Sequence, residues 1–115
     1  MEKENKTLYP GITSEMVSKA KAKWGDKKIR TAECGIDEDT DDVLVVLLRR
    51  PNRQVMNEYV KWADKSPAKA DEILVNSCLL SHKEEVKANE FLFGNVVDAI
   101  SQIIPTPRKA VVKEI

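Results

Sequence analysis

The spacing of apolar residues changes along the chain and predicts a helix, then a hairpin, then more helices. Residues 13–24 place Met16, Val17, Ala20 and Trp24 at helical spacing. Residues 28–36 alternate and include β-branched side chains, which favours a strand. Residues 43–48 are apolar at every position, so we expect a strand covered on both faces, or on one face and at an interface. The two strands are predicted to pair as an antiparallel hairpin, which needs helices to cover it.

Residues 37–42 are almost all acidic and are predicted to form the loop of that hairpin. The pattern after Pro51 is helical, and four positions can start helices: an Asn cap, a Ser-Pro pair, a capping box from Ser to Glu and a second Asn cap. They are Asn52, Ser66-Pro67, Ser81 with Glu84, and Asn89. The shared apolar face of the last helix is predicted to comprise Phe93, Val96, Val97, Ile100 and Ile104.

These elements predict an α+β fold, with an N-terminal helix, an antiparallel β-hairpin and then three or four packed α-helices. Residues 1–12 are expected to be a flexible segment, in which Pro10-Gly11 marks a turn. Residues 13–104 are expected to form a single domain. Residues 105–115 are expected to be a tail, because Pro105 and Pro107 end the last helix. The tail itself is read either as a frayed helix or as a late strand.

Charge and hydropathy remove several classes of function. Nineteen basic residues balance nineteen acidic ones, so the basic excess of a dedicated nucleic-acid binder is missing. The longest apolar run, residues 43–48, is far shorter than the ~18 residues of a membrane span. The polar N-terminus carries no apolar signal region, so we expect a cytoplasmic protein with free thiols. The lysines between residues 19 and 30 are read as a solvated helix face. A nucleic-acid accessory role stays as an alternative, and it predicts binding that falls steeply with salt.

Reactive residues do not form a recognisable catalytic or metal site. Asp37, Asp39 and Asp41 begin like a calcium loop, but the sixth position is not Gly and the twelfth is Leu48, which cannot bind a cation. Zinc needs about four ligands, and the chain has two cysteines and one histidine. A pair of Cys78 with His82 would be interrupted by the predicted cap at Ser81, and no phosphate-binding glycine loop is present. We therefore expect no enzyme, no metal and no cofactor.

Aromatic side chains beside the predicted core suggest contact with a partner. Trp62 lies next to the apolar stripe of its helix, and aromatic residues are enriched in interface hot spots. Residues 91–93 are all large and apolar, so they cannot all face one core. Packing on a neighbouring helix is the alternative for each side chain. The candidate partner-binding residues are Tyr59, Trp62, Phe91 and Leu92.

The order of motifs resembles that of small tail assembly chaperones of tailed bacteriophages. A strand runs into Arg49-Arg50-Pro51-Asn52-Arg53, and a helix with Val55 and Tyr59 follows. The segments Ala70 to Leu80 and Glu85 to Phe93 then match the later helices of that family. The resemblance covers about residues 28–104, and its motifs concern helix packing.

This resemblance implies a non-enzymatic phage or prophage protein. Members of the family bind the long, helical and apolar tape measure protein, keep it soluble and help to recruit tail tube protein in the bacterial cytoplasm. Weak contacts suffice if many copies bind one client, and zero net charge lets copies self-associate with little repulsion. The alternative hypothesis is a small adaptor that binds a folded partner through the same apolar helix surfaces.

Overall fold

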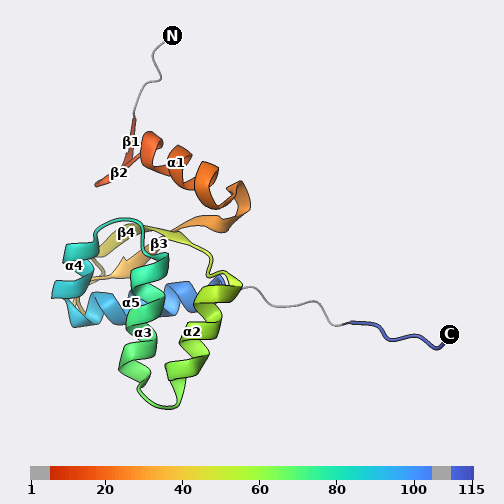
Figure 1. The fold of residues 1–115 in the computed structure, drawn as a ribbon. Helices are drawn as coiled ribbons and strands as arrows, with labels where there is room; N and C mark the ends of the chain where they lie inside the picture. The colour runs from red at the N-terminus through yellow and green to blue at the C-terminus, as the bar shows by residue number, and fades with distance from the viewer. Residues whose placement is uncertain (1–5, 105–109) are drawn as a thin grey trace, which may run out of the picture.

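The fold has an antiparallel hairpin, β3–β4, as a middle layer between helices. Figure 1 shows α1 on one face of this hairpin and α2, α3 and α5 on the other. The computed structural model describes residues 6–104 and 110–115. The elements are β1 (Thr7–Tyr9), β2 (Ile12–Thr13), α1 (Ser14–Trp24), the 3-10 helix η1 (Asp26–Lys28), β3 (Ile29–Gly35), β4 (Val43–Arg49), α2 (Arg53–Ala63), α3 (Pro67–Cys78), α4 (Lys83–Ala88) and α5 (Glu90–Gln102). The predicted α+β class is confirmed.

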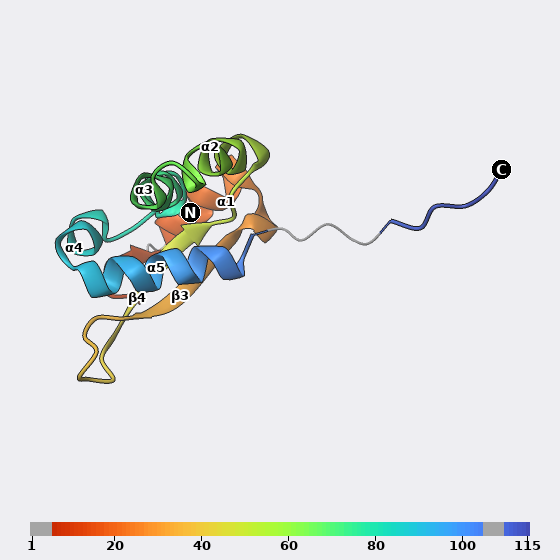
Figure 2. The same cartoon turned by 90° about the horizontal axis from the view of Figure 1, so that it is seen from below.

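The two strands of the central hairpin pair from Ile29↔Arg49 at one end to Gly35↔Val43 at the other. The acidic loop joins them and projects beyond the helices (Figure 2). Because side chains alternate along a strand, Leu47 faces α1 while its neighbours Val46 and Leu48 face α3 and α5. The apolar run at residues 43–48 is therefore explained by helices on both faces, as predicted.

Each face of the hairpin has its own core. The core under α1, here the small core, consists of Ile12, Ala20, Ile29 and Leu47. The core under α3 and α5, here the main core, is larger and includes Cys34, Val46, Leu48, Val55, Leu74, Val75, Cys78, Leu79, Val86, Leu92, Val96 and Ile100. The hairpin alone would be marginally stable in water, and these two cores supply the cover that it needs.

Four helices begin at a side-chain cap, and the sequence analysis predicts three of these caps, at Asn52, Ser66 and Asn89. In each, the cap oxygen accepts a hydrogen bond from the backbone N–H three residues later, which satisfies a donor at the helix start. The caps are Thr13, Asn52, Ser66 and Asn89. The predicted capping box at Ser81 is wrong, because α4 begins at Lys83 after His82, which adopts a left-handed conformation with φ of 52°. Ser81 Oγ accepts instead from the backbone N–H of Leu47 at 2.8 Å.

Two arginines fasten the end of β4 to the helices on the main face. Arg49 Nε donates to the Ser77 carbonyl at 2.6 Å, near the end of α3. Arg50 Nε donates to the Ile103 carbonyl at 3.1 Å, just after α5. Both acceptors lie at helix C-termini, where carbonyl groups lack helical partners and a cation is favoured.

The N-terminal segment, expected to be flexible over residues 1–12, contains a short hairpin. β1 and β2 pair across the Pro10-Gly11 turn, and the side chain of Ile12 is fully buried in the small core. Ile12 thus gains a core that α1 and the hairpin build together, and the flexibility expected of residues 1–12 stays a prediction. Residues 1–5 lie outside the described part of the chain.

At the other end, α5 stops at Gln102. Pro105 and Pro107, which were expected to end it, lie outside the described residues. Residues 110–115 form neither helix nor strand and are exposed, so neither reading of the tail applies to them in this structure.

Candidate partner-binding surfaces

The aromatic residues of α2 lie at the border between the main core and solvent. Tyr59 is half-buried and packs against the main core. Trp62 is also half-buried, and Lys69 Nζ lies 3.7 Å from the centre of its ring. Val60, between them in sequence, is 66% exposed. Parts of Tyr59 and Trp62 are thus accessible, but both already have packing partners.

Phe91 and Leu92, at the start of α5, have different environments. Leu92 is 2% exposed and belongs to the main core, so its assignment to a partner-binding surface is wrong in this fold. Phe91 is 41% exposed, and its ring lies against Gly35, where a Cβ atom would be only 3.1 Å from the ring. The α2 aromatics and Phe91 therefore occupy separate parts of the molecule.

A largely apolar hollow beside α1 was not predicted from the sequence. This α1 groove has a volume of about 260 Å³ and is lined by Met16, Lys19, Ala20, Lys23, Trp24, Leu47 and Leu80. Apolar side chains form its floor, and the two lysines stand on its rim. The helical spacing of Met16, Ala20 and Trp24 was visible in the sequence. Leu80 joins them because its N–H donates to the Leu47 carbonyl at 2.8 Å.

Trp24 in this groove is flanked by two cations. Lys23 Nζ lies 4.7 Å and Arg49 Cζ 5.1 Å from the centre of its ring. A cation over an aromatic ring is attracted by the negative face of the ring. The groove can therefore receive apolar side chains while favouring acidic groups around them.

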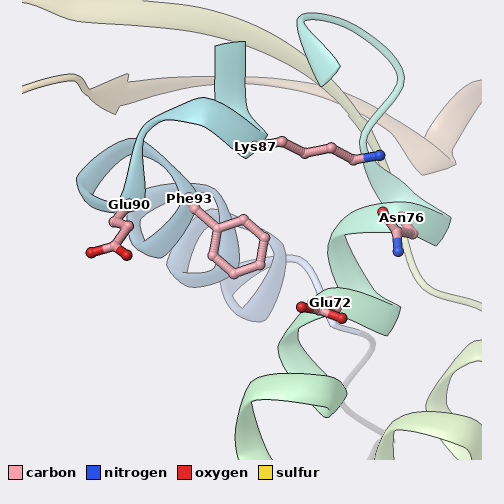
Figure 3. A pocket seen from close by; sticks show the side chains of 5 residues that line it. All are labelled: Glu72, Asn76, Lys87, Glu90 and Phe93. Carbon is pink, nitrogen blue, oxygen red and sulfur yellow. The ribbon is translucent and has the colours of Figure 1, made fainter. Parts of the chain in front are cut away.

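A second hollow, of about 480 Å³, lies between α3, α4 and the start of α5 (Figure 3). Phe93 contributes an apolar surface, and Glu72, Asn76, Lys87 and Glu90 surround it with polar groups of both charges. Such a lining can position a polar or amphipathic ligand.

The thiols are unsuited to covalent chemistry. Cys34 and Cys78 are both free and buried. Burial raises the pKa of Cys34 to about 11, and the nearby Asp98 carboxylate adds to this shift. Burial also raises the pKa of Cys78 to about 11, against an opposing effect of Arg49. Because only the thiolate is a good nucleophile or metal ligand, both side chains are unreactive at neutral pH.

His82 is used to join elements. Its Nε2 lies 2.9 Å from the Pro10 carbonyl and its Nδ1 lies 2.9 Å from Ser81 Oγ. Because a carbonyl only accepts, the neutral ring donates from Nε2, and Ser81 donates to Nδ1. This chain of bonds connects the N-terminal turn, His82, Ser81 and the β4 backbone at Leu47. It occupies both ring nitrogens of the histidine, so neither is available to pair with Cys78.

Within the described residues, no group of three or more His, Cys, Asp or Glu side chains is placed to bind a metal ion. No helix in that same part of the chain is both long enough and apolar enough to cross a membrane. Comparisons with protein-family models, with curated proteins and with solved structures found no match for this chain.

Proposed function

We propose that this protein is a non-enzymatic tail assembly chaperone of a phage or prophage, which binds the tape measure protein and keeps it soluble during tail assembly. The motif order of residues 28–104 supports the family, and the α1 groove supports the mode of binding. The proposed role is carried out in the bacterial cytoplasm, with tail tube protein as a further partner.

The α1 groove is the single observation that carries this proposal. An amphipathic helix can lay its apolar side chains into a hydrophobic groove, and the pattern of its charged residues then sets specificity. Met16, Trp24 and Leu80 offer the apolar contact, and Lys19 and Lys23 stand where acidic residues of such a helix would lie. The client segment is therefore an amphipathic helix whose apolar face is bordered by Asp or Glu.

A groove of this size gives a weak single contact. A tape measure protein is long, so many copies of the chaperone can bind along one client, and linkage of the sites raises the overall affinity. The prediction that follows is a complex with several chaperone copies for each client chain.

Co-expression with the tape measure protein tests the proposal. We expect the wild-type chain to co-purify with the client and to increase its soluble fraction. Met16→Asp should abolish both effects, because it places a carboxylate in the apolar floor. Ser18→Asp adds the same charge at an exposed position of the same helix and is the matched control.

Met16 also packs against the small core, so its replacement can weaken folding. The double variant Lys19→Glu with Lys23→Glu reverses the rim charge at two exposed positions and leaves the core untouched. It should reduce client binding while the melting temperature falls only slightly, because the Lys19–Glu15 ion pair and the Lys23–Trp24 contact that it removes are both at the surface. Full binding by this variant would exclude the α1 groove, and no binding by the wild type would exclude the chaperone function.

The aromatic candidates are tested in the same assay. Trp62→Ala and Phe91→Ala are expected to weaken client binding more than folding. If either change mainly lowers the melting temperature, that side chain serves packing. Recovery of one defined folded host protein, with no effect on the tape measure protein, would favour the adaptor hypothesis.

A further inference from the structure

Among the described residues, β3 pairs with β4 alone. The edge of β3 that faces away from β4, here the outer edge, therefore has no strand partner among them. The Ile36 N–H donates to the Asp42 carbonyl at 3.2 Å, and antiparallel pairs alternate between bonded and non-bonded residues. Counting back in steps of two, residues 34, 32 and 30 direct their backbone groups toward β4. Thr31 and Glu33 therefore direct their N–H and C=O groups outward, away from the hairpin.

The corresponding edge of β4 is closed at Leu47. Its N–H donates to Ser81 Oγ, and its carbonyl accepts from Leu80 N–H. The next residue, Leu48, forms a β-bridge with Leu79. The described part of the chain thus covers part of one edge of the hairpin and leaves the edge of β3 open.

A groove of about 240 Å³ runs beside the open edge, between β3 and α5. Ala32, Ala99 and Ile103 give it apolar surface. The exposed side chains of Asp98 and Glu33 give it two negative charges against the one positive charge of Arg30. A strand that added to β3 would direct every second side chain toward this groove. Backbone hydrogen bonds would then give affinity and the groove would give specificity, as in other cases of strand addition.

The chain carries a segment with matching chemistry at its C-terminus. Residues 110–115, Ala-Val-Val-Lys-Glu-Ile, are rich in β-branched side chains, which favour strands. Val111 is 79% exposed, Val112 is 92% exposed and Ile115 is fully exposed, so this apolar surface has no cover. In a strand, Val111, Lys113 and Ile115 share one face, which places a cation between two apolar side chains. That face suits a groove whose lining combines apolar side chains with two carboxylates, Glu33 and Asp98, and one cation, Arg30.

We propose that residues 110–115 of one copy add as a strand to the outer edge of β3 in a second copy. The groove would hold Val111 and Ile115 against its apolar walls and Lys113 near Asp98. This self-association goes beyond the proposed function and does not depend on the identity of the client.

The direction of α5 favours a second copy over the same chain. Phe91 at its start lies against Gly35, and Ile103 after its end lines the groove with Arg30, so α5 runs antiparallel to β3. A chain that leaves α5 near Arg30 and continues directly along its own β3 edge runs parallel to β3. A second copy can add in the antiparallel direction, which gives the more stable pairing.

The test is the solution mass of the full chain, measured by sedimentation over a range of concentrations. We expect the wild type to self-associate. Val111→Asp should weaken association by at least tenfold, because it places a carboxylate against the apolar wall of the groove. Val112→Asp adds the same charge on the opposite face of the strand and should have a much smaller effect.

A second pair of variants tests the edge itself. Thr31→Pro removes an outward N–H that the β3–β4 pairing does not use, so it should block strand addition while the circular dichroism spectrum is unchanged. Thr31→Val keeps that N–H and should associate like the wild type. If Thr31→Pro fails to fold, the comparison of Val111→Asp with Val112→Asp decides whether the strand adds to β3.

Three results would overturn the proposal. The first is a wild type that stays monomeric at all concentrations. The second is a monomer whose residues 110–115 are protected from hydrogen exchange, which would mean that the segment covers its own edge. The third is association that Val111→Asp leaves unchanged, which would place the contact on another surface.

Discussion

At the scale of single residues, Gly11 shows how one position joins two parts of the fold. Its φ is +80°, and a Cβ atom there would collide with the imidazole of His82. Glycine therefore permits both the turn between β1 and β2 and the close approach of His82, which bonds to the Pro10 carbonyl.

Gly11→Ala should consequently destabilise the protein by more than Gly25→Ala. Gly25 also has a positive φ, +108°, but a Cβ atom there would meet only a lysine side chain at 3.8 Å. We expect about 1 kcal/mol for Gly25→Ala from backbone strain, and about 2–3 kcal/mol for Gly11→Ala, where the collision adds to the strain. Chemical denaturation measures both values, and equal losses would contradict the role of His82.

Ser81 is the buried polar side chain that links β4 to the chain after α3. Ser81→Ala leaves the buried N–H of Leu47 without its acceptor, and we expect a loss of about 1–3 kcal/mol in unfolding free energy. Ser18→Ala, at an exposed position of α1, should change stability by less than about 0.5 kcal/mol. A loss at Ser81 no larger than that at Ser18 would show that water replaces the hydroxyl group.

These positions also show which residue roles can be predicted from the sequence. The caps at Asn52 and Asn89 were predicted correctly, because donor and acceptor are three residues apart in the chain. The cap at Ser81 was predicted wrongly, because the N–H that uses its hydroxyl lies 34 residues away. A local pattern cannot reveal a distant competitor for the same oxygen.

At the scale of elements, α5 is the helix whose orientation the sequence did not determine. The predicted face began at Phe93 and ran through Val96, Val97 and Ile100. The buried line is Leu92, Val96 and Ile100, with Phe93 and Val97 at its margin. The apolar side of this helix is wide, from Leu92 across to Val97, so its pattern does not tell which of these residues lies at the centre of the buried face. The shape of the hairpin and of α3 selects one of them.

The neighbouring residues Phe91 and Leu92 test this orientation. Leu92→Ala should cost about 2–5 kcal/mol, because it leaves a cavity in the main core. Phe91→Ala should cost about 1 kcal/mol or less, because much of its ring is already in contact with solvent. Thermal or chemical denaturation gives both values, and the reverse order would mean that α5 is rotated about its axis.

At the scale of the whole molecule, the two cores differ in size, and their stabilities should differ accordingly. Among the described residues, the small core contains four buried side chains and the main core twelve. Local opening requires less energy where fewer apolar contacts are lost. We expect amides of α1 to exchange with deuterium at least about tenfold faster than the slowest amides of α3 and α5.

Hydrogen exchange followed by mass spectrometry of peptides measures this difference. Peptides from residues 14–24 would be compared with those from residues 67–78 and 90–102. Equal protection of all three would show that both cores open only when the whole protein unfolds.

The whole-molecule scale also explains what could not be predicted about the candidate site. The α1 groove requires Leu47 and Leu80 to meet Met16 and Trp24, and these four residues come from three separate parts of the chain. Periodicity predicted each element but not their contact. The apolar stripe of α1 was predicted, but which of its residues stay exposed depends on how the hairpin packs against the helix.

The acidic tip of the hairpin offers a practical consequence. It extends past both helical layers, and local side-chain bonds shape it: Asp37 Oδ1 accepts from Asp39 N–H and Thr40 Oγ1 from Asp42 N–H. A flexible insertion between Asp39 and Thr40 would lengthen a connection already outside both cores, and the entropy of closing a loop grows only slowly with its length. An epitope tag or a fluorescent label introduced there would report on the intact protein while both of its ends stay unmodified.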